Sequence, residues 1–178
     1  GTTVLEWSFP GSDNPRGALQ EYLAKVAETA RELFRRQQIR TLFLRQIRDA
    51  EGYEGDRAII AGFRSQIGEA GFVCEDFLDP EVLRGVIRRC EVFWGTRLHA
   101  NIFAMTQLVP VVGIAYQHKT EGIMRMMGQG EYVVWIDRFT VPELIAKIEL
   151  ALERKVGIVA TLATKFGELE RQRVELCR

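Results

Sequence analysis

The sequence carries no excess of either charge, because 24 Lys and Arg residues are matched by 24 Asp and Glu residues. A neutral chain has no global attraction to nucleic acid or to an anionic membrane surface, so we expect neither as a partner. Long apolar runs are missing as well. The most apolar run, residues 108–116, contains a Pro and a Gly and is too short to span a bilayer, which predicts no membrane-spanning helix.

Patterns for disulfides, metals and nucleotides are also absent. The cysteines Cys74, Cys90 and Cys177 are odd in number and widely spaced, and there is no CxxC pair or Cys/His cluster for zinc. We therefore expect free thiols in the reducing cytoplasm and no metal or other cofactor. Neither a GxGxxG nor a GxxxxGK phosphate loop occurs.

What is present is a regular alternation of short apolar runs with segments of helical period. Strands are predicted at residues 2–8, 41–44, 72–74, 91–94, 109–114 and 132–136, and helices at about 17–36, 56–70, 80–89, 97–105, 121–127, 141–153 and 158–175. Strict alternation is typical of a doubly wound α/β fold. We therefore expect one Rossmann-like domain over residues 1–178, with a parallel sheet of about six strands and a terminal helix within residues 158–178.

Two features of the predicted helices are specific. Thr140 is placed to cap the helix that ends near Glu153. The terminal helix has apolar residues at roughly helical spacing, which predicts that it packs back on the domain. These residues are Leu162, Phe166, Leu169 and Val174.

The junctions between strands and helices are the places to look for a site. In an open parallel sheet, ligands bind beyond the carboxyl ends of the strands, where helix N-termini present free N–H groups. At residues 95–99 (GTRLH), Thr96 is placed to cap the next helix, with Arg97 at its first position and His99 two residues further on. Arg97 offers a bidentate fork for carboxylate or phosphate, and His99 offers a proton donor. A capping or surface role explains a lone His equally well.

Other junctions give weaker signals. Lys119 follows the strand at 109–114 and fits either a second anionic group or a solvated loop cation. His118 beside it is interpreted as a bystander. Arg16 lies at the first junction, which matches no phosphate-binding signature, and Asp56 is interpreted as an ordinary N-cap.

Two segments together resemble the signature of the polysaccharide pyruvyl transferase family: GTRLHANIFA at residues 95–104 and VPVVGIAYQHK at residues 109–119. Gly55-Asp56-Arg57 is similar to an acidic-Arg element of that family. The resemblance covers roughly residues 40–150. It implies that the chain is the C-terminal, donor-binding half of a two-domain enzyme like the GT-B glycosyltransferases.

The resemblance also implies a reaction. Family members transfer the pyruvyl skeleton of phosphoenolpyruvate to two hydroxyls of a sugar in an exopolysaccharide or cell-wall glycan, forming a ketal and releasing phosphate. Phosphoenolpyruvate and the glycan are then the expected partners. Thr96, Arg97, Leu98, Tyr116 and Lys119 correspond to donor-binding positions, and His99 to the general acid.

One departure and several alternatives stay open. Many family members carry an Arg after the first strand, where this chain has Phe9-Pro10, so either Arg16 substitutes for it or the donor is held differently. A nucleotide-sugar-dependent GT-B glycosyltransferase half is one alternative, although its Gly-rich turn and ribose-binding acid are not found. A non-catalytic docking module is the other. The acceptor sugar, and whether a partner N-terminal domain or a homo-oligomer completes the site, are left open.

Overall fold

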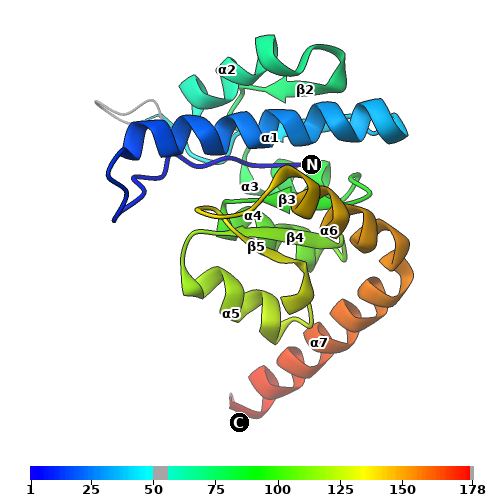
Figure 1. The fold of residues 1–178 in the computed structure, drawn as a ribbon. Coiled ribbons are helices and arrows are strands. Elements are labelled where there is room, and N and C mark those ends of the chain that lie inside the picture. The colour runs from blue at the N-terminus through cyan, green and yellow to red at the C-terminus, as the bar shows by residue number, and fades with distance from the viewer. Residues whose placement is uncertain (50–55, 177–178) are drawn as a thin grey trace.

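The computed structural model describes residues 1–49 and 56–176 (Figure 1). Its helices are α1 (Pro15–Gln37), α2 (Arg57–Ile67), α3 (Pro80–Ile87), α4 (Leu98–Thr106), α5 (His118–Met126), α6 (Val141–Glu153) and α7 (Lys155–Leu176), with 3₁₀ turns η1 (Gly68–Ala70) and η2 (Gly130–Tyr132). Its strands are β1 (Thr41–Leu44), β2 (Gly71–Cys74), β3 (Phe93–Gly95), β4 (Val111–Ala115) and β5 (Val133–Trp135). The predicted alternation of strands and helices is confirmed.

All strand pairs are parallel, and they form two sheets, β1–β2 and β3–β4–β5. The extended segment 1–3 lies between the sheets and bonds to both through its backbone. These bonds run from Thr2 N–H to Leu42 C=O and from Leu44 N–H to Thr2 C=O on one side, and from Trp94 N–H to Gly1 C=O and Thr96 N–H to Thr3 C=O on the other. The hydrogen-bonded order is therefore β2, β1, segment 1–3, β3, β4, β5.

The predicted single sheet of about six strands is wrong, because the described residues form five strands in two sheets. The missing strand is the one predicted at residues 2–8, where Thr2 makes only an isolated bridge to Phe43. Side-chain bonds interrupt regular pairing there. The Thr2 hydroxyl donates to the Trp94 carbonyl, and the Thr3 hydroxyl accepts from the Arg97 N–H.

Helices cover the sheets in two groups, since α1 contacts both α2 and α6 while α3 contacts α4. Aromatic side chains fill the core between the two sheets. The Phe43 ring of β1 stacks on Phe63 of α2 at 4.6 Å between centroids and meets Trp94 of β3 edge-on at 6.4 Å. Full burial of rings of this size stabilises the fold by roughly 2–3 kcal/mol each, so this cluster ties the two sheets together.

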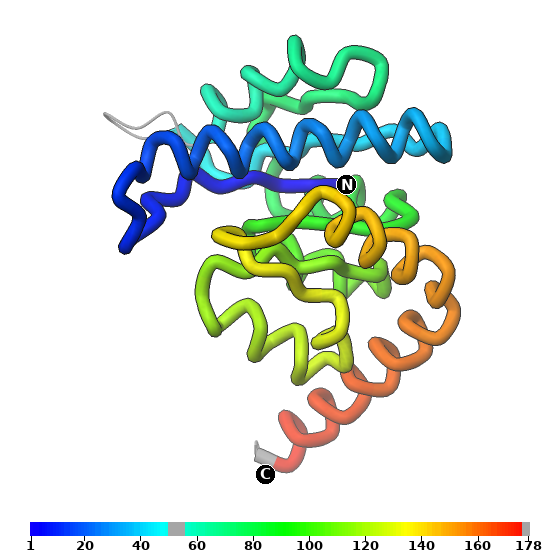
Figure 2. The backbone as a smooth tube through the Cα atoms, in the orientation of Figure 1, coloured from blue at the N-terminus to red at the C-terminus, as the bar shows by residue number. Residues whose placement is uncertain are grey.

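The terminal helix α7 follows α6 almost directly and contacts α4 and α6 (Figure 2). Its first half packs as predicted, because Ile158 and Leu162 are buried. The prediction is wrong for the second half, where Leu169 and Val174 are 37% and 43% exposed. Apolar residues are too sparse there to form a continuous face, and Cys177 lies outside the described residues. None of the described helices combines the length and the apolar character needed to cross a membrane.

Candidate active site

The candidate site lies where β3 and β4 end. Gly95 and Gly113 are paired across these strands, so the residues after Gly95 and Ala115 emerge at the same edge of the sheet. Two residues separate β3 from α4, and two residues likewise separate β4 from α5. Neither N-cap, Arg97 or Gln117, caps its helix with a side-chain hydrogen bond among the described residues. The two helices therefore direct first-turn N–H groups and positive dipole ends toward one place.

A pocket of about 200 Å³ occupies this place. It is lined by Gln46, Ile47, Arg97, Leu98, His99, Tyr116, Gln117, Lys119 and Thr120. Five residues singled out from the sequence therefore meet here, namely Arg97, Leu98, His99, Tyr116 and Lys119. His99 and Lys119 are exposed, so both are accessible to a ligand.

Arg97 is firmly held on one side of this pocket. One guanidinium nitrogen, Nη2, forms an ion pair with the Asp56 carboxylate, and Nε donates to the Val4 carbonyl at 3.3 Å. The Arg97 side chain keeps 15% of its surface exposed, whereas Asp56 keeps 1%. Within the described residues, Nη1 donates to no protein group, and Arg97 lines the pocket.

Asp56 does something different from what the sequence predicted. It precedes α2 at the N-cap position, but its side chain makes no capping bond. One carboxylate oxygen binds Arg97, and the other accepts the backbone N–H groups of Gln46 and Ile47 at 3.3 and 3.0 Å. Asp56 therefore links the loop after β1 to the start of α4. Its neighbour Gly55 lies outside the described residues.

Thr96 lies behind the pocket rather than in it. The prediction that it caps α4 is wrong, because Arg97 holds the N-cap position and Thr96 is fully buried. Its hydroxyl is 2.6 Å from the Tyr22 hydroxyl of α1. Burial raises the pKa of Tyr22 to about 12, which keeps the phenol protonated at physiological pH. Thr96 thus anchors the strand end and does not line the pocket.

Arg16 and Phe9 lie outside this pocket. Arg16 is exposed and lines a separate depression beside Glu6, Trp7 and Leu19. Arg16 and Arg97 therefore line different pockets. The Phe9 ring is buried and packs 6.3 Å from Tyr22, in a backbone conformation with φ of 47°.

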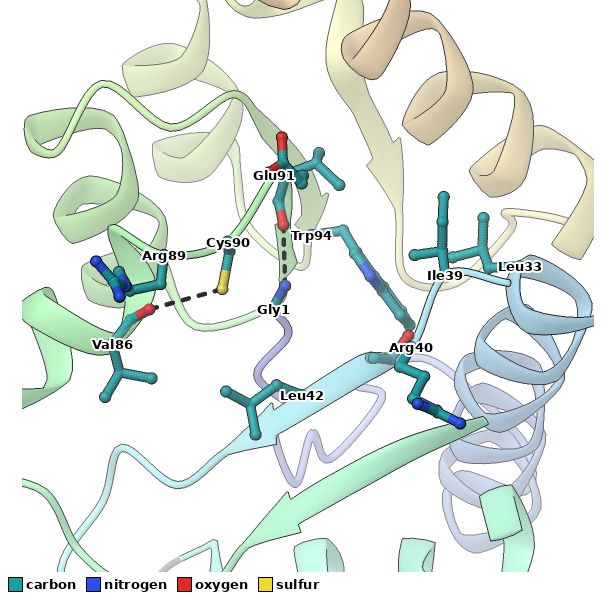
Figure 3. A pocket seen from close by; sticks show the side chains of 12 residues that line it. Gly1, Leu33, Ile39, Arg40, Leu42, Val86, Arg89, Cys90, Glu91 and Trp94 are labelled. Carbon is teal, nitrogen blue, oxygen red and sulfur yellow. Dashed lines mark hydrogen bonds between the residues drawn. The ribbon is translucent and has the colours of Figure 1, made fainter. Parts of the chain in front are cut away.

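A larger pocket of about 480 Å³ lies at the opposite edge of the sheets, where β1 and β3 begin (Figure 3). Ile39, Arg40, Cys90 and Glu91 are among its lining residues, and none of the site residues singled out from the sequence reaches it. Ligands of parallel sheets bind at the carboxyl ends of the strands. We therefore assign the candidate site to the smaller pocket at Arg97.

Sequence reasoning missed several residues at this edge. Asp56 was interpreted as an ordinary N-cap because it lies directly before a helix. Its role as the partner of Arg97 was therefore not predicted, although the acidic-Arg element at residues 55–57 was. No sequence pattern indicated that Tyr22 supports the site, because an aromatic residue on an amphipathic helix is ordinarily interpreted as part of the core. Trp7 and Trp135 were also missed, although each lies close to the predicted end of a strand.

Together, the parallel α/β fold and the paired helix N-termini with Arg97, His99 and Lys119 define a domain suited to an anionic ligand. Residues 14–118, more than half of the chain, match the polysaccharide pyruvyl transferase family, and the chain belongs to that family. It is therefore related to transferases that act on polysaccharides.

One curated relative is the amylovoran biosynthesis protein AmsJ of Erwinia amylovora, which is 33% identical over 81 residues. The aligned segment covers 46% of this chain but only 19% of AmsJ, so the chain matches a minor part of that relative's length. No solved structure matches the chain.

Proposed function

We propose that this chain binds phosphoenolpyruvate in the pocket at Arg97 and serves the transfer of its pyruvyl group to two hydroxyls of a polysaccharide sugar. The observation that carries the proposal is the convergence of Arg97, His99 and Lys119 on one pocket, in a chain of the pyruvyl transferase family. We further propose that the chain is the Rossmann-like, donor-binding half of a GT-B-like enzyme working in the cytoplasm. The hydrogen-bonded order, with segment 1–3 at its centre, is that of doubly wound nucleotide-binding sheets and supports this assignment.

Phosphoenolpyruvate carries a phosphate and a carboxylate, and the pocket offers matching groups for both. Arg97 Nη1 and the first-turn N–H groups of α4 suit one anionic group. Lys119, in the first turn of α5, suits the other. Since Asp56 already neutralises part of the Arg97 charge, Lys119 and the two helix dipoles supply much of the remaining attraction.

His99 is our candidate general acid. It is the second residue of α4, is exposed and lines the pocket beside Arg97. When one sugar oxygen attacks C2 of the donor, the C2=C3 electron pair takes a proton, which His99 delivers to C3. The second hydroxyl then attacks C2, the bond from C2 to the phosphate oxygen breaks, and phosphate leaves. The hydroxyl protons return to His99 and to solvent.

Calorimetric titration with phosphoenolpyruvate tests the donor site. We expect saturable binding that is weakened at least tenfold in Lys119→Ala and unchanged in Arg125→Ala, a cation on α5 that is exposed and outside the pocket. Lys119 is the preferred variant because it is exposed, whereas Arg97→Ala would leave the buried Asp56 charge unpaired and disturb folding.

His99→Gln separates binding from chemistry. We expect this variant to bind phosphoenolpyruvate nearly as well as the parent chain, and to lower the rate of ketal formation at least a hundredfold in the complete enzyme. Binding of a nucleotide sugar in place of phosphoenolpyruvate would instead favour a glycosyltransferase half. Binding of neither would favour a docking module.

A further inference from the structure

A second pocket, of about 320 Å³, adjoins the donor pocket at the same edge of the sheets. Tyr116, the residue after β4, lines both pockets. Besides Tyr116, the second pocket is lined by Trp7, Phe9, Pro10, Gly11, Ser12, Trp135, Ile136 and Asp137. Its volume lies within the range of small-molecule sites.

Large aromatic rings dominate this pocket and remain partly exposed. Trp7 and Tyr116 lie 4.7 Å apart between ring centroids with their planes inclined at 52°, and Trp135 ends the neighbouring strand β5. The chain buries its third tryptophan, Trp94, almost completely in the core. Two half-exposed indoles and a phenol around one hollow therefore form a surface suited to a partly apolar ligand.

Neighbouring side chains hold Trp135 in place. The Arg138 guanidinium lies 5.1 Å from the ring centroid of Trp135, and the His118 ring meets it edge-on, also at 5.1 Å. These two contacts restrict the Trp135 ring, so it loses less conformational freedom when a ligand packs against it. His118, which sequence reasoning left as a bystander, thus supports this second pocket.

Asp137 gives the pocket its polar character. Its carboxylate is exposed and takes part in no hydrogen bond or ion pair within residues 1–49 and 56–176. A free carboxylate accepts hydrogen bonds from hydroxyls and repels anions. The pocket is therefore unsuited to a second phosphate and suited to a neutral polyol.

We propose that this second pocket binds a pyranose ring of the glycan acceptor. The C–H-rich face of the sugar stacks on the aromatic rings, which removes apolar surface from water, and its hydroxyls donate to Asp137. The inference rests on the proposed function, since an acceptor sugar is needed only if the chain serves pyruvyl transfer. Tyr116 lines both pockets, so a sugar bound here would lie beside the donor. Acceptor recognition then belongs in part to this chain.

Saturation-transfer NMR with methyl β-glucoside, β-galactoside and β-mannoside, each titrated separately, tests the subsite. We expect at least one glycoside to bind saturably in the millimolar range, and both Trp135→Ala and Asp137→Asn to weaken it at least fivefold. Asp137 is exposed, so its substitution does not endanger folding. Phe72→Ala, which removes an aromatic ring that is 61% exposed on β2, is the matched control and should change nothing.

The two proposals fail in different ways. If phosphoenolpyruvate binds but no glycoside binds in the millimolar range, the subsite proposal alone is overturned. If a glycoside binds but phosphoenolpyruvate does not, the donor assignment alone is overturned. Glycoside binding that neither variant weakens would place the sugar elsewhere and overturn the subsite. Uridine monophosphate is the probe for a nucleoside. If it binds, Trp135→Ala abolishes this binding and no glycoside binds, the sugar subsite is overturned in favour of a nucleoside site.

Discussion

At the scale of single residues, the site depends on how Arg97 is held. Its guanidinium lies between the Val4 carbonyl and the carboxylate of Asp56, which in turn accepts the N–H groups of Gln46 and Ile47. A side chain fixed at two of its nitrogens loses little freedom when a third binds a ligand. We therefore interpret Asp56 as a positioning residue that prepares Arg97.

Replacing Asp56 by Asn should lower the free energy of unfolding by about 2–4 kcal/mol, because it leaves the mostly buried Arg97 cation without its anion. The uncompensated charge should then attract added anions. We expect phosphate to raise the melting temperature more steeply in Asp56→Asn than in the parent chain, as measured by thermal unfolding at several phosphate concentrations.

Glu170→Gln is the matched control for this experiment, because Glu170 pairs with Arg173 on the exposed part of α7. Its loss should leave the free energy of unfolding almost unchanged, because water screens an exposed ion pair of this kind. Equal stability of Asp56→Asn and the parent chain would refute the ion pair.

The hydroxyl pair of Tyr22 and Thr96 supports the end of β3 from behind. Tyr22→Phe should lower the free energy of unfolding by about 1–2 kcal/mol at neutral pH, because the buried Thr96 hydroxyl loses its partner. Urea unfolding of the two proteins measures the difference. A variant as stable as the parent would mean that the pair contributes nothing.

The same pair predicts a dependence on alkaline pH. Burial raises the pKa of Tyr22 from 10.0 to about 12 in the folded chain, so the unfolded chain loses this proton first as the pH rises. The stabilisation is complete below the unfolded pKa and falls by about 1.4 kcal/mol per pH unit between the two pKa values. The stability advantage over Tyr22→Phe should therefore shrink between about pH 10 and pH 12, and a constant advantage would contradict the assignment.

At the scale of elements, local chemistry predicted some helix starts and failed at others. Thr140 caps α6 as predicted, and a reciprocal bond from its N–H to the Glu143 side chain completes a capping box. Thr96 is just as suitable a cap by type, yet its hydroxyl meets Tyr22, which lies 74 residues earlier. A capping motif is predictable where no tertiary partner competes for the hydroxyl.

Thr140→Ala should lower the free energy of unfolding by about 1 kcal/mol, because the Glu143 N–H at the start of α6 loses its acceptor. Thr164→Ala is the control, since its hydroxyl donates to Ala160 within α7 and caps nothing. Urea unfolding of both variants measures the contrast. Equal effects would show that the capping box does not stabilise α6.

The candidate site was predictable in outline for a related reason. Arg97, His99 and Lys119 follow the carboxyl ends of paired parallel strands, so the fold class alone brings them to one edge. Asp56, Trp7 and Trp135 come from other parts of the chain, and their contacts with the site depend on packing that no local pattern encodes. The sequence therefore predicted the groups that line the pocket better than the groups that hold them.

At the scale of the whole molecule, segment 1–3 decides whether the two sheets behave as one unit. It is hydrogen-bonded on both edges, and Phe43 of β1 contacts Trp94 of β3 behind it. Local periodicity could not reveal that this segment joins two sheets, because its partners lie about 40 and 90 residues away. The candidate site spans the same junction, with Asp56 on one side and Arg97 on the other.

We therefore expect the two sheets to unfold in one cooperative transition. The N–H groups of Leu44, Trp94 and Thr96 are bonded to this segment, so hydrogen exchange at these amides should require global unfolding. The exposed second half of α7 should exchange orders of magnitude faster. Hydrogen-exchange NMR measures both regions in one sample. If Leu44 and Trp94 exchanged much faster than Val112 in the middle of the second sheet, the segment would open independently, and the Asp56–Arg97 pair that spans the junction would open with it.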